Sequence, residues 1–444
     1  MTEDDTARIS RRATLALAGS VALAGCSALQ DPLGGEDHTT IDGTKLQQVA
    51  TAEGPSIPET IPVDVEQAAL DDARARAEDL LASVPVPLDS SEIPNGAIRE
   101  EVSRQYEEAE NELTRATEAG SRFEAMGRLR RARGDARAAA TAWAAIDADV
   151  TRSDLAATLP GLRDDVAAFR ERRRYVGDDP VRAVVVHDAV EDLLERAQHR
   201  VSPDDEKRRW REVLENPIAV GEFAGRLEEA RAALDDAAYL YDRFEASLST
   251  PRDLGPTFEA ASSSLLDDVL RRNENLPSGN APSDFVDADV EGTPAADALE
   301  DLYFGIDRTD YIEDRHAAGS YASAVLLAYW DLTEFRAFDV LRERVADGER
   351  FTVESADGVI SRRQSAVEAV NAALADSAHP VLARHVVSKL AGSIRYVDDE
   401  LERVDDEVRA AWLSRELSRY VTTEAVADVL PAATGQVVEA LDAA

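Results

Sequence analysis

The chain has 444 residues, of which 88 are acidic and 49 are basic, so its formal net charge is −39 at pH 7. This charge excludes nucleic acid as a partner, because phosphate contacts need clustered lysine and arginine side chains. The hydrophobic fraction of 44% excludes general disorder and allows a sizeable core. The single cysteine, Cys26, excludes an intramolecular disulfide.

The first predicted element is an export signal. Arg11 and Arg12 precede a short apolar run, residues 13–25, which ends in Leu-Ala-Gly before Cys26. The run is too short to cross a bilayer, which takes about 20 apolar residues, and its order is that of a signal peptide. The pattern resembles the signal of lipoproteins exported by the twin-arginine route. The resemblance implies cleavage after residue 25 and a lipid on Cys26, which would hold the mature chain at the outer face of the cytoplasmic membrane.

The acidic composition has a second implication. The chain contains only three lysines, at positions 45, 207 and 389, and this combination resembles exported proteins of salt-loving archaea. In 1 M salt the Debye length falls to about 3 Å, so the repulsion between carboxylates is screened. A GC-rich coding sequence is the alternative, and it explains the arginines better than the acid excess. We expect the folded state to depend on salt.

Residues 26–63 are expected to form a flexible spacer behind the lipid, because proline and glycine recur there without a sustained period. From Asp64 onward the apolar residues recur at helical spacing, which predicts an N-terminal helical domain over residues 64–276. The most regular stripe consists of Leu227, Ala230, Leu234, Ala237, Tyr241 and Phe244. Such a stripe is typical of a helix packed inside an antiparallel bundle.

An acidic linker is predicted over residues 277–293, which are rich in proline, glycine and aspartate. A C-terminal helical domain follows over residues 294–444. Its most apolar segment, residues 321–345, leaves little polar face and predicts a central helix that is surrounded on most sides. Charged residues such as Asp331 and Arg336 exclude a membrane span there. The predicted fold is all-α, either a multi-helix antiparallel bundle or a solenoid-like array, in two helical halves.

The chain lacks the short motifs of the common enzyme classes. It contains no GxxxxGK, GxGxxG, GxSxG, HExxH or CxxC motif. Their absence makes an enzyme less expected without excluding one, and no cofactor can be named.

One candidate metal site is a row of four side chains at i, i+4, i+8 and i+12, which places neighbours on adjacent turns of one helix. The row consists of His187, Glu191, Glu195 and His199. Imidazole and carboxylate groups suit zinc or iron. The alternative is a solvated helix face with contacts between glutamate and histidine.

A candidate calcium site lies in the acidic linker. Asp287, Asp289, Glu291 and Gly292 follow the order D-x-D-x-E-G, which resembles the first half of an EF-hand loop. Ala298 occupies the position of the bidentate glutamate, so the alternative is a solvated acidic linker.

The sequence therefore predicts an exported, lipid-anchored binding or scaffold module with a protein partner. The alternative is a ligand- or metal-binding receptor component of a transport system. A receptor requires a concave site lined by converging polar groups. A scaffold would instead expose an apolar or heptad-patterned face.

Overall fold

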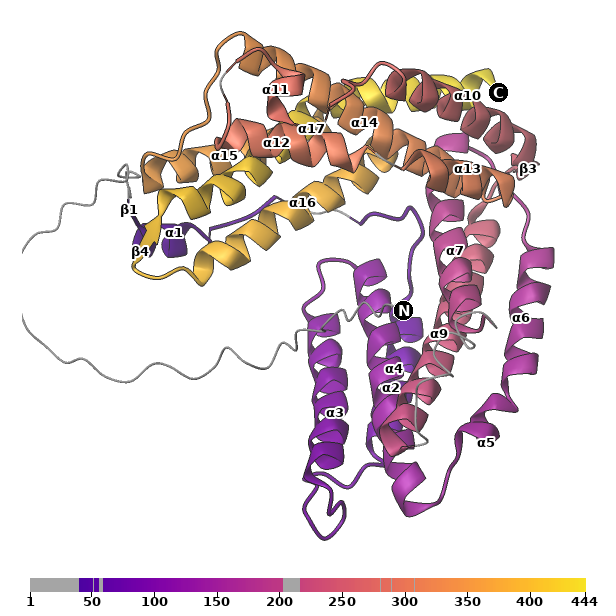
Figure 1. Cartoon of the computed structure of the whole chain (residues 1–444). Helices are drawn as coiled ribbons and strands as arrows, with labels where there is room; N and C mark the ends of the chain where they lie inside the picture. Colours follow the sequence, from indigo (N-terminus) through magenta and orange to yellow (C-terminus); the bar gives the residue numbers. More distant parts are fainter. Residues whose placement is uncertain are drawn as a thin grey trace, which may run out of the picture. The chain divides into compact units, whose positions relative to one another are not determined.

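Helices dominate the computed structural model, and its strands are short (Figure 1). The structure describes residues 40–50, 52–55, 59–202, 216–279, 281–288, 290–306 and 308–444. The predicted signal residues Arg11, Arg12 and Cys26 lie outside the described residues. The predicted all-α class is confirmed, as is the division into two helical halves.

The N-terminal half is built around α4 (Arg122–Asp147), which contacts α2 (Gln67–Leu81), α3 (Gly96–Thr117) and α9 (Pro217–Ser247). These four helices lie side by side in Figure 1. The side-chain oxygen of Ser121 accepts a hydrogen bond from the backbone of Glu124 and caps α4. The predicted stripe on α9 is buried along its whole length, as packing inside a bundle requires.

Helix α7 (Pro180–Arg200) connects this half to the next, because it contacts α9 as well as helices of the C-terminal half. Its start follows from sequence: the Asp179 side chain accepts a hydrogen bond from the backbone of Arg182, and Pro180 occupies the first helical position. Three shorter elements precede it in the chain, namely α5 (Arg152–Ala156), α6 (Leu159–Arg172) and β2 (Val176–Gly177). Strand β2 pairs in antiparallel fashion with β3 (Arg252–Asp253).

The C-terminal half surrounds α14 (Tyr321–Ala346), which contacts α10 (Gly255–Asn273), α12 (Pro294–Gly305), α13 (Thr309–Ala317) and α17 (Ala410–Ala443). Most side chains of α14 are buried, so the prediction of a central helix is confirmed. Helix α17 also contacts the two helices before it, α15 (Ala356–Ala375) and α16 (Pro380–Glu402).

Helix α10 differs from the prediction in its position. Its place in the sequence predicts that it belongs to the N-terminal domain, before the linker of residues 277–293, but it contacts α13, α14 and α17. The proline and glycine residues of that linker therefore interrupt the second half, where the short helix α11 (Pro282–Phe285) lies. Composition marks an irregular segment, and it does not tell a loop within a domain from a boundary between domains.

The predicted spacer of residues 26–63 needs a correction, because its described part is folded from Thr40 onward. Strand β1 (Thr40–Asp42) pairs with β4 (Glu407–Arg409), and α1 (Gly43–Ala50) contacts α15 and α16. Ile41 and Leu46 are buried in the core. An element this short carries too few apolar residues to show a period in the sequence.

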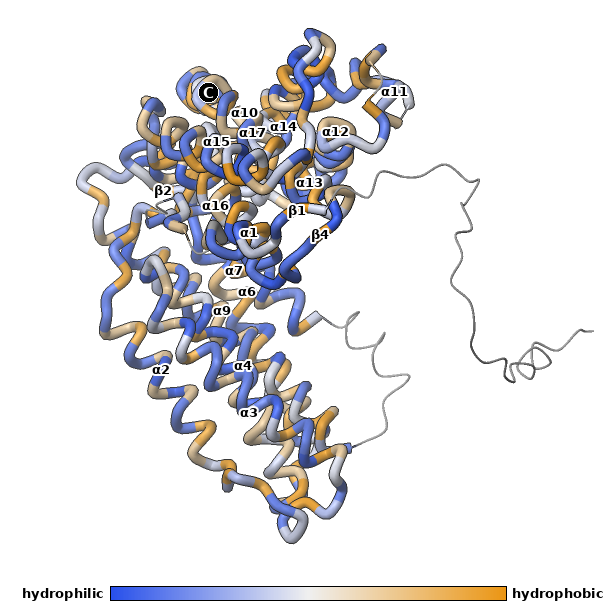
Figure 2. The backbone as a smooth tube through the Cα atoms, turned by 90° about the vertical axis from the view of Figure 1, so that its left-hand side faces the viewer, coloured by the Kyte–Doolittle hydropathy of each residue, from blue (hydrophilic) through white to orange (hydrophobic). Residues whose placement is uncertain are grey.

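The helices of the N-terminal half pack closely where glycine replaces a side chain. A Cβ atom at Gly221 on α9 would lie 2.4 Å from the carbonyl oxygen of Ala138 on α4, and one at Gly225 would lie 2.8 Å from that of Gly134. Figure 2 shows hydrophilic and hydrophobic residues interleaved along the helices, as expected of helices with one buried face. Among the described residues, no helix combines the length and the apolar character that a membrane span needs.

Candidate functional site

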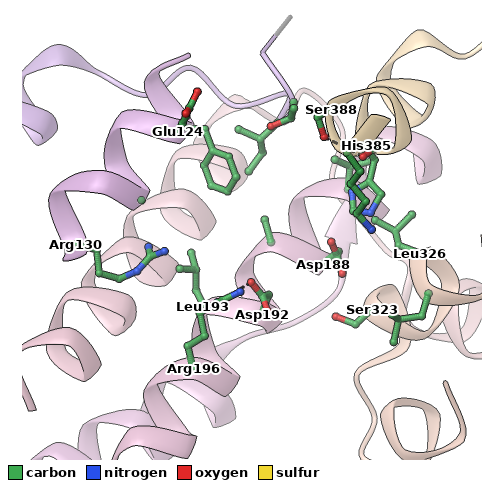
Figure 3. Close-up of a pocket in the computed structure, with 18 of the residues that line it drawn as sticks. Glu124, Arg130, Asp188, Asp192, Leu193, Arg196, Ser323, Leu326, His385 and Ser388 are labelled. Carbon is green, nitrogen blue, oxygen red and sulfur yellow. Dashed lines mark hydrogen bonds and ion pairs between the residues drawn. The ribbon is translucent and has the colours of Figure 1, made fainter. Parts of the chain in front are cut away.

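A cavity of about 570 Å³ lies among α4, α7, α14 and α16 (Figure 3). Each helix contributes residues at helical spacing, which gathers them on one face. Helix α7 contributes Val185, Asp188, Ala189, Asp192, Leu193 and Arg196. Helix α14 contributes Ser323, Leu326 and Leu327, and α16 contributes His385, Ser388 and Lys389. The volume lies within the range of about 300 to 1,000 Å³ that small-molecule sites occupy.

Basic residues outnumber acidic residues in the lining of the cavity, which is the opposite of the whole chain. The basic lining residues are Arg128, Arg130, Arg131, Arg196, Arg315 and Lys389. The acidic lining residues are Glu124, Asp188 and Asp192. In the whole chain acidic residues outnumber basic ones 88 to 49, so this is a local concentration of positive charge.

Each of these arginines already has a carboxylate partner. Arg196 bonds Asp192 at 2.9 Å, Arg130 bonds Asp236 at 2.7 Å, and Arg315 pairs with Glu195. Arg128 and Arg131 share Glu112 at 3.5 and 3.0 Å. These pairs fix the arginines in the wall, and a ligand would have to compete for them.

Asp188 has no such cation. Among the described residues no arginine, lysine or histidine lies within ion-pair distance of its carboxylate, and Ser323 is its side-chain hydrogen-bond partner. Burial raises the pKa of Asp188 to about 7, and the negative charges of Glu191 and Asp192 add to this rise. In Figure 3 Asp188 points into the space between α7 and the helices that carry Ser323 and His385.

Lys389 is the unpaired cation of the cavity. Its nearest described partner is the ring of Trp330, whose centroid lies 4.6 Å from Nζ. Lys389 is exposed, and the surrounding protein desolvates it enough to lower the pKa of its ammonium group. One turn earlier, burial lowers the pKa of His385 to about 3, so its imidazole is neutral at pH 7.

A buried network behind the cavity fixes the start of α14 against α7. The Glu191 carboxylate accepts a bond of 2.6 Å from Arg173, one from the Tyr175 hydroxyl, and one of 2.8 Å from the backbone N–H of Ser323. The Tyr175 hydroxyl in turn accepts from the backbone N–H of Tyr321 at 2.9 Å. The network positions Ser323 beside Asp188.

The structure does not assemble the predicted row of metal ligands. His187 is buried among aromatic rings, with Nε2 2.9 Å from the carbonyl oxygen of Val176. Glu191 and Glu195 are paired with arginines. His199 lines two other surface pockets. Within the described ranges, no three His, Cys, Asp or Glu side chains are grouped to hold a metal.

The predicted calcium residues are described in part. Asp287 and Glu291 are exposed, and Gly292 has φ +71°, in the left-handed region that favours glycine. Asp289 lies outside the described residues. An EF-hand loop has a glycine in a sharp turn at this place, and Gly292 has a suitable conformation. The calcium site itself stays a prediction.

The residues of the cavity were missed by the sequence analysis. Asp188 lies between two members of the predicted metal row, but its partners on α14 and α16 are more than 130 residues away. Lys389 offered a signal, because it is one of three lysines in the chain and follows His385 by four residues.

Residues 68–250 match the family model DUF8262, and residues 255–439 match DUF8264; both are described as domains of unknown function. The second match begins at the first residue of α10, in agreement with the contacts of that helix. The cavity takes α4 and α7 from the first matched range and α14 and α16 from the second. No curated protein and no solved structure matches the chain.

Proposed function

We propose that this protein is an exported, lipid-anchored binding protein that holds a small solute in the cavity. One observation carries the proposal: Asp188, His385 and Lys389, none of which is in an ion pair with a described residue, converge on a cavity with partly apolar walls. Burying Asp188 and His385 without an ion pair costs free energy, which a ligand that bonds them would offset. The arrangement favours the receptor alternative of the sequence analysis.

The scaffold alternative has less support. The exposed large apolar residues of the described chain are Val86, Phe304, Tyr311, Tyr396 and Trp412. They lie on separate elements, and single exposed apolar residues are normal on protein surfaces. A docking face for a protein partner would instead form a continuous apolar patch.

Release of a bound solute from the denatured protein tests the proposal. The full chain carrying Cys26→Ser would be purified from its native host in molar salt without detergent, and then heat-denatured. Mass spectrometry of the supernatant should detect one small molecule in an amount equal to the protein. Ala189→Trp, which fills the cavity, should abolish its recovery, whereas Ala372→Trp on the exposed face of α15 should not. Equal recovery from all three proteins, or no recovery from any, would contradict the proposal.

The proposed setting is the outer face of the cytoplasmic membrane, with a lipid on Cys26 as the anchor. The twin-arginine pair and the Leu-Ala-Gly-Cys sequence support it. Mass spectrometry of the membrane-bound native protein should find lipid on Cys26 at the mature N-terminus. The variant Cys26→Ser should either be released from the membrane or keep its signal peptide. An unmodified Cys26 in membrane-associated protein would exclude this anchor.

A further inference from the structure

We propose that the solute is a small organic anion, a carboxylate with an apolar body, and that Lys389 is its counter-charge. The inference rests on the proposed function, because it names the class of ligand that the same cavity takes. It follows from the sign of the lining charges, the pairing of those charges and the chemistry of the walls.

The one lining cation without a carboxylate partner in the described chain favours an anion. Six basic residues and three acidic ones face the cavity. Five of the six cations are arginines that already bond carboxylates of the protein. Lys389 alone among the six has no carboxylate of the described chain within ion-pair distance. The ammonium group of Lys389, exposed and without a carboxylate at ion-pair distance in the described chain, therefore offers a local attraction for a negative ligand.

The acidic residues do not favour a cationic ligand. Asp192 is held by Arg196, and Glu124 lies beside Arg128 at 3.5 Å. This leaves Asp188, which hydrogen-bonds Ser323 and whose pKa burial raises to about 7, so its carboxyl group takes up a proton far more readily than an ordinary aspartate does. Protonated Asp188 and neutral His385 can each donate a hydrogen bond to a carboxylate. The groups that face Lys389 from other elements are Asp188, Asp192 and Glu334 with negative charge and Arg308 with positive charge.

The walls require an apolar body. The apolar lining residues that keep partly exposed surface are Ala189 on α7, Leu327 on α14 and Phe123 on α4. A bare inorganic ion would leave this surface in contact with water, whereas an alkyl or aromatic group would bury it, which is favourable. The cavity therefore combines one cationic end with an apolar wall.

The test is calorimetric titration of the full chain carrying Cys26→Ser, in molar sodium chloride, with straight-chain carboxylates from acetate to octanoate. We expect binding that strengthens with chain length. The amide and the amine of the same length should bind at least about tenfold more weakly, since a charge-assisted hydrogen bond is worth about 1.5 to 3 kcal/mol. Lys389→Met should weaken the carboxylates by a similar factor. Lys45→Met is the matched control, because it removes a lysine from the exposed surface, where it pairs with Asp357 at 3.4 Å.

Three outcomes would overturn the inference. Tighter binding of the amine would show that the site recognises a cation through Asp188. Equal losses in Lys389→Met and Lys45→Met would show that the carboxylates bind elsewhere. No heat from any carboxylate, with a solute still released from the native protein, would reject the anion class and leave the proposed function standing. The absence of any released solute would reject the proposed function itself.

Discussion

Asp188 and Glu191 lie one turn apart on α7, yet they have different surroundings. Glu191 is fixed by Arg173, Tyr175 and the backbone of Ser323, so it is part of the framework. Asp188 lines the cavity, hydrogen-bonds Ser323 and has no described cation within ion-pair distance. A carboxylate that is desolvated and unpaired lowers stability, and such groups concentrate at binding sites.

The unfavourable burial of the Asp188 carboxylate predicts that the free energy of unfolding depends on pH. Its pKa in the folded protein is about 7, against an ordinary value of 3.8, so the folded state binds the proton more tightly than the unfolded chain. The free energy of unfolding therefore falls as the pH rises from about 4 to about 7. Asp188→Asn removes this loss, and the variant should be more stable than wild type at pH 8 by more than about 1 kcal/mol.

Urea unfolding at pH 8 and pH 4 measures this difference. The advantage of Asp188→Asn should disappear at pH 4, where wild-type Asp188 is protonated. Asp376→Asn on the exposed surface corrects for the loss of one charge. A difference that does not change with pH would mean that the carboxyl group of Asp188 is not desolvated.

At the scale of the helices, α4 and α9 pack closely where Gly221 and Gly225 let the two backbones approach. The apolar stripe of α9 was predictable, because helical periodicity is a local property of the sequence. The close approach was not, since it depends on which residues of another helix lie opposite.

Gly221→Ala tests this packing. The added Cβ would lie 2.4 Å from a backbone oxygen of α4, so the two helices must shift, at a cost of about 1 to 3 kcal/mol. Gly392→Ala in α16 is the control, because no atom lies within 4 Å of its Cβ position. It should be neutral or stabilising by up to about 1 kcal/mol. Thermal melts that rank the two variants in the opposite order would contradict the packing.

The segment of residues 40–50 gives a second prediction at this scale. Leu46 is fully buried, so Leu46→Ala should cost about 2 to 5 kcal/mol. A chain that begins at Thr40 should melt at the same temperature as the full chain, whereas one that begins at Asp64 should melt lower. Equal melting temperatures of the two truncated chains would support the original prediction of a flexible spacer over residues 26–63.

For the whole molecule, the net charge of −39 opposes the compact state. In dilute buffer the Debye length approaches about 30 Å, and exposed ion pairs contribute only about 0 to 1 kcal/mol each. The summed repulsion then takes away part of a native stability of only about 5 to 15 kcal/mol.

We therefore expect the melting temperature of the full chain carrying Cys26→Ser to rise steadily from millimolar to molar sodium chloride. The same series with sucrose at equal osmolality controls for general exclusion of solute. A melting temperature that does not change with salt would remove the inference to a saline habitat.

The sequence predicted the helices better than it predicted the site, for a physical reason. The central position of α14 and the stripe of α9 follow from residues that are close in the chain. The row from His187 to His199 has a spacing that serves equally for metal ligands and for a helix with one buried face, and here His187 points into the core. The cavity is formed by four helices from two matched domains. No local sequence pattern predicts which helices pack against one another.

The central claim, that a small organic anion binds in this cavity, is tested most directly by a crystal structure of the protein purified from its native host without detergent. We expect electron density for one small molecule between α7, α14 and α16, with an acidic group at the Nζ atom of Lys389 and its apolar part against Ala189 and Leu327. A cavity that holds only water, with Lys389 solvated, would contradict it.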